Sequence, residues 1–162
     1  MGYKDFLNVV NYYGKDILEH DRMQLEKKFI QHGDFSVYEH SVSTAIHCLR
    51  IAYIFNIDVD IKSLVRGALL HDYFLYDWHV YNPENKGHAT KHAGRALKNA
   101  MEDFDLNDIE KNMIYCHMFP VNLRFPKYKE GWILCMADKI SATYETVVPR
   151  LKKLIRVLGY SN

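Results

Sequence analysis

The chain has 162 residues, of which 48% are hydrophobic and 25% are charged, a balance typical of a soluble globular protein. The formal net charge of +1 favours neither nucleic acid nor a membrane surface as a partner. No apolar run is long enough to span a bilayer, and the first residues lack the apolar stretch of a signal peptide. We therefore expect a cytoplasmic protein.

The cysteines exclude two further classes. Cys48, Cys116 and Cys135 are odd in number, lie within apolar helical patterns and form no CxxC pair. A disulfide framework and a thiolate zinc site are both disfavoured by this arrangement. We expect three buried structural thiols.

Helical spacing begins in the first residues. Apolar side chains recur at helical intervals over residues 6–17, with Gly14 as a weak point. A second helix is expected to start after Asp21 and to continue through Ile30, until Gly33 breaks it.

Capping signals mark the next two helices. Residues 36–39 read Ser-Val-Tyr-Glu, which is a capping box, so a helix should begin there and end near Asn56. Asp60 can cap a following helix that leads to His71 and Asp72.

The second half of the chain continues the same pattern. After a loop over residues 76–87, one helix carries His88 and His92. Asn107 with Glu110 predicts the start of another helix, which ends at His117.

The last helices are expected to divide at a proline. A long helix should follow the loop over residues 120–129 and end near Pro149, with a short basic helix before Gly159. No strand-like alternation competes with this series of helices. The prediction is an all-α fold in which residues 1–162 form a single helical domain.

The pair His71-Asp72 stands at the end of the apolar run over residues 64–70. Burying a carboxylate costs several kcal/mol unless a cation pairs with it, and no Lys or Arg is placed locally to do so. A bound metal ion would satisfy both side chains.

Further ligand types lie along the chain in the same kind of position, at helix ends or on apolar faces. Each alone has a structural explanation, but the ordered set is not easily accidental. His47 is excluded because it lies about two helical turns from His40. The candidate metal ligands are His40, His71, Asp72, His92, His117 and Asp138.

The ligand count favours two ions. Six ligands are too many for one ion that must also admit water and substrate, whereas two ions that share Asp72 as a bridge use them all. Four neutral imidazoles and two carboxylates without thiolate suit Fe or Mn best, with Zn, Co or Ni as alternatives. Two such ions can activate a hydroxide and bind a phosphoryl group, so Asp72 is also the candidate catalytic residue.

The order of these residues resembles the HD-domain superfamily of metal-dependent phosphohydrolases over about residues 30–147. His92 and His117 look like the dinuclear branch, which includes the bacterial symmetrical diadenosine-tetraphosphate hydrolases. The resemblance implies an all-helical HD-type fold that hydrolyses a phosphate ester or anhydride, often of a nucleotide. It also implies a first metal held by His40, His71, Asp72 and Asp138, and a second held by Asp72, His92 and His117.

One departure from the family pattern bears on the class of substrate. Residue 75 is Leu75 where many relatives have a Lys, and no Gly-Tyr-Pro segment follows. Cyclic-dinucleotide phosphodiesterase chemistry is therefore disfavoured. The expected partner is a small phosphorylated molecule, such as a nucleotide, and the sequence indicates no oligomeric state.

Four residues are weaker candidates for substrate contacts. Lys139 follows Asp138 on the same helix, and Arg124 lies in the loop after His117 with Lys127 and Lys129. A solvated surface position is the alternative for each of these cations. The substrate-contact candidates are His88, Lys139, Arg124 and His32.

Two other functions remain open at this stage. A di-iron oxygenase is known on the same scaffold, so ligand count does not separate it from a hydrolase. A non-catalytic module that senses a metal or nucleotide is the third hypothesis, although an intact ligand set argues against it.

Overall fold

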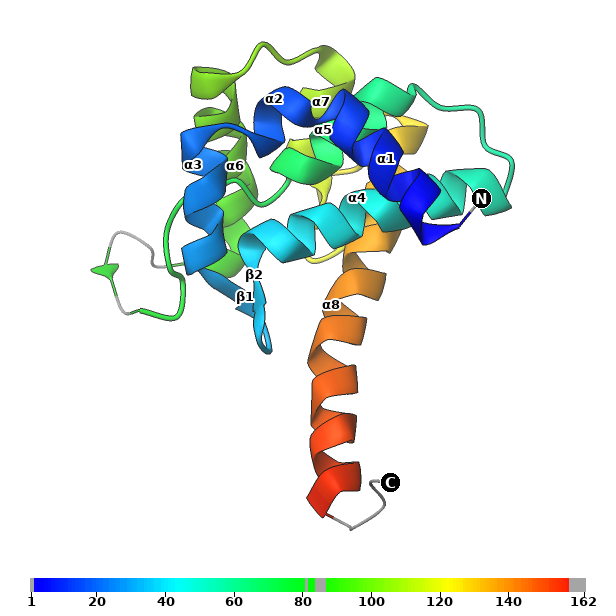
Figure 1. Ribbon diagram of the computed structural model, residues 1–162. Helices are drawn as coiled ribbons and strands as arrows, with labels where there is room; N and C mark the ends of the chain where they lie inside the picture. Colours follow the sequence, from blue (N-terminus) through cyan, green and yellow to red (C-terminus); the bar gives the residue numbers. More distant parts are fainter. Residues whose placement is uncertain (1, 81, 84–86, 158–162) are drawn as a thin grey trace.

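The computed structural model describes residues 2–80, 82–83 and 87–157, with side chains as far as residue 151. The predicted all-α fold is confirmed, since helices pack around one another and the described strands form a single two-stranded hairpin (Figure 1). None of the helices within these residues combines the length and apolar character needed to cross a bilayer.

The N-terminal segment forms two helices, α1 (Tyr3–Tyr13) and α2 (Lys15–Leu18), which separate at Gly14 as predicted. Gly14 sits against α5 (Ile61–Leu70), where a Cβ would lie only 2.3 Å from the Leu69 Cδ1 atom. The break therefore marks a close approach of the two segments.

The predicted helix through Ile30 is wrong. Helix α3 (Asp21–Leu25) gives way to a single 3₁₀ turn, η1 (Glu26–Lys28), and the chain then forms the antiparallel hairpin of β1 (Ile30–His32) and β2 (Phe35–Ser36). Helical propensity over so short a segment is weak and tertiary contacts override it.

Gly33 closes this hairpin in the left-handed region, with a φ of 60°. A Cβ there would lie 2.8 Å from the Glu145 carbonyl oxygen of α8 (Lys129–Val157), so a larger residue would be both strained and crowded. The tip of the hairpin is thus seated directly on α8.

The predicted caps are confirmed. Ser36 begins α4 (Val37–Ile54) with the capping box to Glu39, and the Asp60 Oδ1 atom accepts a hydrogen bond from the Ser63 N–H at the start of α5. After α6 (His88–Asp103), Asn107 and Glu110 form a second capping box that begins α7 (Asp108–Cys116).

Helix α8 runs without interruption through Pro149, so the predicted break there is wrong. Pro149 lacks an N–H, which leaves the Glu145 carbonyl without its helical donor, and that carbonyl is the one that faces Gly33. The second half of α8 projects from the helical body beside the hairpin (Figure 1). Gly159, the predicted end of the last helix, lies outside the described residues.

Helices α4 and α5 form the centre of the hydrophobic core. Every residue of α5 from Ser63 to Leu70 is buried, so this helix delivers His71 and Asp72 into the interior. Burial of each large apolar side chain contributes about 1.5–3 kcal/mol, which fixes the helix ends that carry the polar residues. The three cysteines are buried and unpaired as expected.

Candidate metal centre

Five helices bring the six candidate ligands together. His40 comes from α4, His71 and Asp72 follow the end of α5, and His92 comes from α6; His117 caps the end of α7, and Asp138 comes from α8. Two groups of three could each hold an ion, because the ligand atoms of each group lie within 4.8 Å of one another. One group is His40, His71 and Asp72, and the other is Asp72, His92 and His117.

Asp72 belongs to both groups and turns one oxygen toward each. Its Oδ2 atom lies 3.4 Å from His71 Nε2 and 3.8 Å from His40 Nε2. Its Oδ1 atom lies 3.3 Å from the Nε2 atoms of both His92 and His117. The carboxylate is therefore oriented as a bridge between the two groups.

Asp138 lies on the His40 side of this bridge. Its Oδ1 atom is 3.2 Å from His40 Nε2 and 3.7 Å from His71 Nε2. The structure thus places Asp138 beside the first group and away from His92 and His117.

The other nitrogen of each histidine ring is already engaged. The Nδ1 atoms of His71, His92 and His117 face the backbone carbonyls of residues 68, 88 and 114 at 2.7, 2.8 and 2.9 Å. His40 Nδ1 lies 2.8 Å from the Glu145 carboxylate. Because these oxygens can only accept, Nδ1 carries the proton and Nε2 presents a lone pair in the neutral ring.

This pattern leaves acceptors facing acceptors. The Nε2 atoms of His92 and His117 are 2.9 Å apart, and His71 Nε2 and Asp72 Oδ1 are buried without any hydrogen-bond partner. Buried polar atoms are normally paired, and a cation bound between these lone pairs would satisfy them. Imidazole nitrogens and carboxylate oxygens without thiolate form a donor set that fits divalent transition metals.

The carboxylates are ionised, as metal ligands must be. Burial alone would raise the pKa of Asp72, but His71, His117 and His92 lower it well below its usual range. Burial likewise opposes ionisation of Asp138, whose pKa is lowered by hydrogen bonds to His40 and His71. Burial lowers the pKa of His117 and keeps that ring neutral.

His40 lies where neighbouring carboxylates stabilise a positive charge. Burial would lower its pKa, but hydrogen bonds to Asp138 and Glu145 raise it to about 10. In the absence of a metal, this ring therefore holds a proton between carboxylates. A bound metal ion would take the place of that positive charge.

Two residues of the centre were missed in the sequence. Glu145 orients His40 and is two helical turns beyond Asp138, so its position on the same face of α8 was the available signal. Gln31 is buried and donates from Nε2 to Asp72 Oδ2 at 2.5 Å. The predicted helix continues only through Ile30, and nothing in the sequence indicates that Gln31 faces the centre.

A pocket of about 300 Å³ opens onto the centre. Its lining includes four of the candidate ligands, Asp72, Asp138, His92 and His117, and the large apolar side chains of Trp78, Met118 and Val121. Three of the four substrate-contact candidates, His32, His88 and Lys139, also line it.

Each of these three has a defined environment. The His32 ring packs edge-on against His40 with centroids 5.4 Å apart. His88 stacks on His92 at 4.6 Å, and burial lowers its pKa to about 4. Lys139 donates from Nζ to the Cys135 carbonyl at 3.0 Å.

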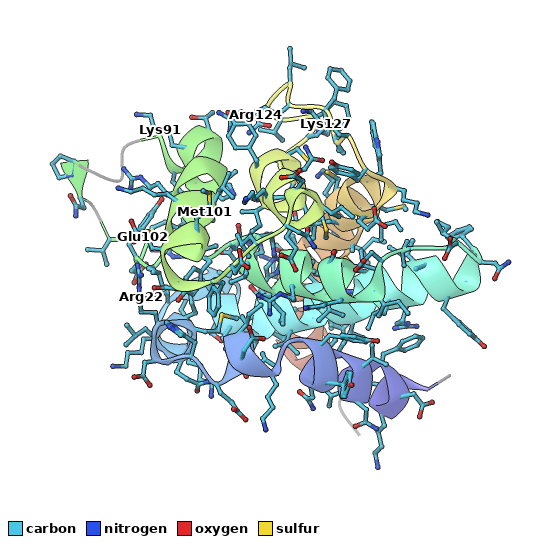
Figure 2. All side chains as sticks on the ribbon, turned by 90° about the horizontal axis from the view of Figure 1, so that it is seen from above. Arg22, Lys91, Met101, Glu102, Arg124 and Lys127 are labelled. Carbon is cyan, nitrogen blue, oxygen red and sulfur yellow. The ribbon has the colours of Figure 1, made fainter. Side chains whose placement is uncertain are left out.

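Arg124, the fourth candidate, does not join them. Its guanidinium lies 4.0 Å from the centre of the Tyr115 ring, and the residue is not among those that line the pocket. Figure 2 shows Arg124 and Lys127 together on the loop after α7, at the rim of the molecule. The cation–π contact holds the Arg124 guanidinium on the Tyr115 ring of α7.

His47, which the sequence excluded, lies apart from both groups. Its Nδ1 atom is 2.8 Å from the Ser141 hydroxyl. It takes no part in either ligand group.

Comparison with known proteins gives a single assignment. Neither the curated proteins nor the solved structures include a match to this chain. The sequence model of the HD domain matches residues 37–143, a span that contains all six candidate ligands but neither Gln31 nor Glu145. HD domains bind divalent metals and are generally hydrolases, in agreement with the His and Asp groups described above. The chain therefore belongs to the HD domain family.

Proposed function

We propose that this protein is a phosphohydrolase with two divalent metal ions, which cleaves a phosphate ester or anhydride of a nucleotide. The observation that carries the proposal is that the two oxygens of Asp72 face two separate histidine groups, while Asp72 Oδ1 and His71 Nε2 have no hydrogen-bond partner. His40, His71, Asp72 and Asp138 would hold one ion, and Asp72, His92 and His117 the other. When bound, two such ions supply positive charge for a phosphoryl group and a water activated as the nucleophile.

Lys139 would bind the phosphoryl group. It is the one Lys or Arg among the described residues that line the pocket. Its ammonium group has three donors, of which the carbonyls of Cys135 and His117, at 3.0 and 3.5 Å, use at most two. The remaining donor is available for a phosphoryl oxygen.

The walls of the pocket suit the rest of a nucleotide. Trp78, Met118 and Val121 present apolar surface, which excludes water from the reacting group and accommodates a nucleoside. About 300 Å³ is the lower end of the size range for small-molecule sites. This volume supports a substrate with one nucleoside at the centre, and the resemblance to diadenosine-tetraphosphate hydrolases makes dinucleotides the second class to screen.

The test is a hydrolysis screen on protein purified without oxygen and loaded with Fe²⁺ or Mn²⁺, which measures both released phosphate and the nucleotide products. Mononucleotides, nucleoside di- and triphosphates, dinucleoside polyphosphates and an aryl phosphate form the panel. We expect metal-dependent hydrolysis of at least one nucleotide. Oxygen-dependent consumption of an organic substrate without phosphate release would contradict the proposal and favour an oxygenase.

Two histidine variants distinguish damage to the metal centre from damage to the fold. His92→Ala should lose mainly the second ion and most of the activity, because His92 contacts only one oxygen of Asp72. His47→Ala is the matched control, since His47 lies outside both groups. Equal loss of both ions in the His92 variant would contradict the assignment of ligands to two sites.

A further inference from the structure

Gln31 connects the wall of the pocket to the carboxylate between the two histidine groups. Its side chain is buried, with 6% of the residue exposed. Its Nε2 atom donates to Asp72 Oδ2 at 2.5 Å, and its Oε1 atom accepts from Trp78 Nε1 at 3.2 Å. A chain of three side chains therefore runs from Trp78 through Gln31 to Asp72.

The chemistry of the two neighbours fixes the orientation of the Gln31 amide. An indole nitrogen can only donate, so the atom that faces Trp78 must be the amide oxygen. An ionised carboxylate can only accept, so the atom that faces Asp72 must be the amide nitrogen. Both requirements give the same orientation, and a flipped amide would break both hydrogen bonds.

The hairpin that carries Gln31 is anchored on both sides. The Val37 N–H donates to the Phe29 carbonyl at 2.8 Å across its open end. Gly33 at the other end is seated on the Glu145 carbonyl. Gln31 therefore meets Asp72 from a fixed support, which is what precise placement of a ligand requires.

This contact decides how Asp72 can be used. Gln31 holds Oδ2 on the side of His40 and His71, which leaves Oδ1 without a hydrogen bond and directed at His92 and His117. A carboxylate without such a partner can rotate and offer both oxygens to one ion. We propose that Gln31 is a positioning residue that keeps Asp72 in its bridging orientation, and that Trp78 orients Gln31; this inference rests on the proposed two-metal function.

The test compares wild type with Gln31→Leu, which keeps the size of the side chain but removes its donor. Both proteins are freed of metal and titrated with Mn²⁺, and bound ions are counted while the electron paramagnetic resonance spectrum is recorded. We expect two ions and an exchange-coupled signal in wild type. The variant should bind its second ion about 10–100-fold more weakly, the effect of losing an outer-shell partner, and should show the six-line signal of an isolated ion.

Trp78→Phe tests the second link, because it keeps an aromatic side chain but removes the indole N–H that donates to Gln31, and it also serves if Gln31→Leu does not fold. It should weaken the second ion by a smaller factor, and it should have no further effect in the Gln31→Leu background. Gln24→Leu is the matched control, because Gln24 donates to the Leu18 carbonyl and does not touch the centre. That variant should behave as wild type.

The outcomes distinguish failure of the inference about Gln31 from failure of the proposed function. If wild type binds two coupled ions and folded Gln31→Leu does the same with unchanged affinity, the inference is wrong and the proposed function stands. Equal effects of Trp78→Phe in both backgrounds would overturn the role of Trp78. A wild-type chain that never binds a second ion overturns the proposed function itself.

Discussion

Two buried charged clusters lie between α5 and α7, and they satisfy their charges in different ways. At one end, Arg66 donates from Nε to Glu110 at 2.9 Å and from Nη1 to Asp16 at 2.6 Å. At the other end, His71 and Asp72 meet His117, and lone pairs face lone pairs. The first cluster, here called the closed cluster, contains its own cation, Arg66. The carboxylates of the second, here called the open cluster, pair with imidazoles, and a bound cation would satisfy the lone pairs that remain.

The difference shows how a buried carboxylate can be interpreted. An ion pair such as Arg66 with Glu110 offsets its desolvation internally, so it indicates structure more than function. The Asp72 carboxylate is surrounded by imidazoles, and three of them turn their Nδ1 protons toward backbone carbonyls. The arrangement of donors around a buried charge thus distinguishes a structural cluster from a metal centre, although Glu110 and Asp72 are equally buried.

The largest effect is expected at the open cluster. Asp72→Ala should bind neither ion and should lose more than about 1000-fold in activity, the upper end of the effect of removing one charge-stabilising group. In the presence of a chelator, its thermal stability should match that of metal-free wild type, because the substitution removes a buried charge together with its contacts. Metal analysis and melting curves with and without Mn²⁺ provide the measurement. A variant that retains two ions would break the contrast between the clusters.

The closed cluster should respond in the opposite way. Glu110→Ala leaves Arg66 buried with only the half-exposed Asp16, so the free energy of unfolding should fall by about 3–5 kcal/mol whether or not metal is present. Replacing both charges, in Arg66→Met with Glu110→Leu, should recover most of this loss. Urea denaturation of the three proteins measures both effects. If Glu110→Ala lowers the free energy of unfolding by less than about 1 kcal/mol, Arg66 does not depend on Glu110 for its charge compensation, and the prediction is wrong.

Much of the open cluster could be predicted, because its ligands are of few residue types and stand at helix ends marked by caps. The capping boxes at Ser36 and Asn107 set the helices that carry His40 and His117. The hairpin with Gln31 could not be predicted, since three residues of β1 are too few to show alternation and its position depends on α8. The position of Arg124 could not be predicted for a related reason, because the orientation of a loop side chain depends on its tertiary partner, here the Tyr115 ring.

The buried carboxylate of Glu26 extends the comparison, because the hydrogen bond described for it comes from a backbone N–H and not from a cation or an imidazole. Its Oε1 atom accepts from the Leu75 N–H at 3.1 Å, and Oε2 has no partner. Burial raises the pKa of Glu26 to about 9, so in the folded protein the group is protonated at neutral pH. The contrast with Asp72, whose pKa is lowered, shows that the imidazoles and not the depth of burial set the charge.

The prediction for Glu26 concerns stability against pH. Because the folded pKa is above that of the unfolded chain, the folded state binds the proton more tightly. The contribution of Glu26 is fully present below about pH 4.5 and is lost as pH rises toward about 9, by at most about 1.4 kcal/mol per pH unit. Glu26→Gln should remove this dependence and unfold at higher denaturant concentration than wild type at pH 8. Parallel curves for the two proteins from pH 5 to 8 would contradict the prediction.

The smallest effect is expected at the cap that leads into the open cluster. Ser36→Ala removes the acceptor for the Glu39 N–H and should lower the free energy of unfolding by about 1 kcal/mol. The number of bound ions should stay the same, because His40 is held directly by the Glu145 carboxylate. Asn107→Ala should cost more, since Asn107 Nδ2 also donates to the Ser63 hydroxyl at 2.8 Å and its box partner, Glu110, belongs to the closed cluster. Denaturation together with metal counting on both variants tests this order. Loss of an ion in Ser36→Ala would contradict the prediction. It would mean that the open cluster depends on the cap of α4, just as the closed cluster depends on the cap of α7.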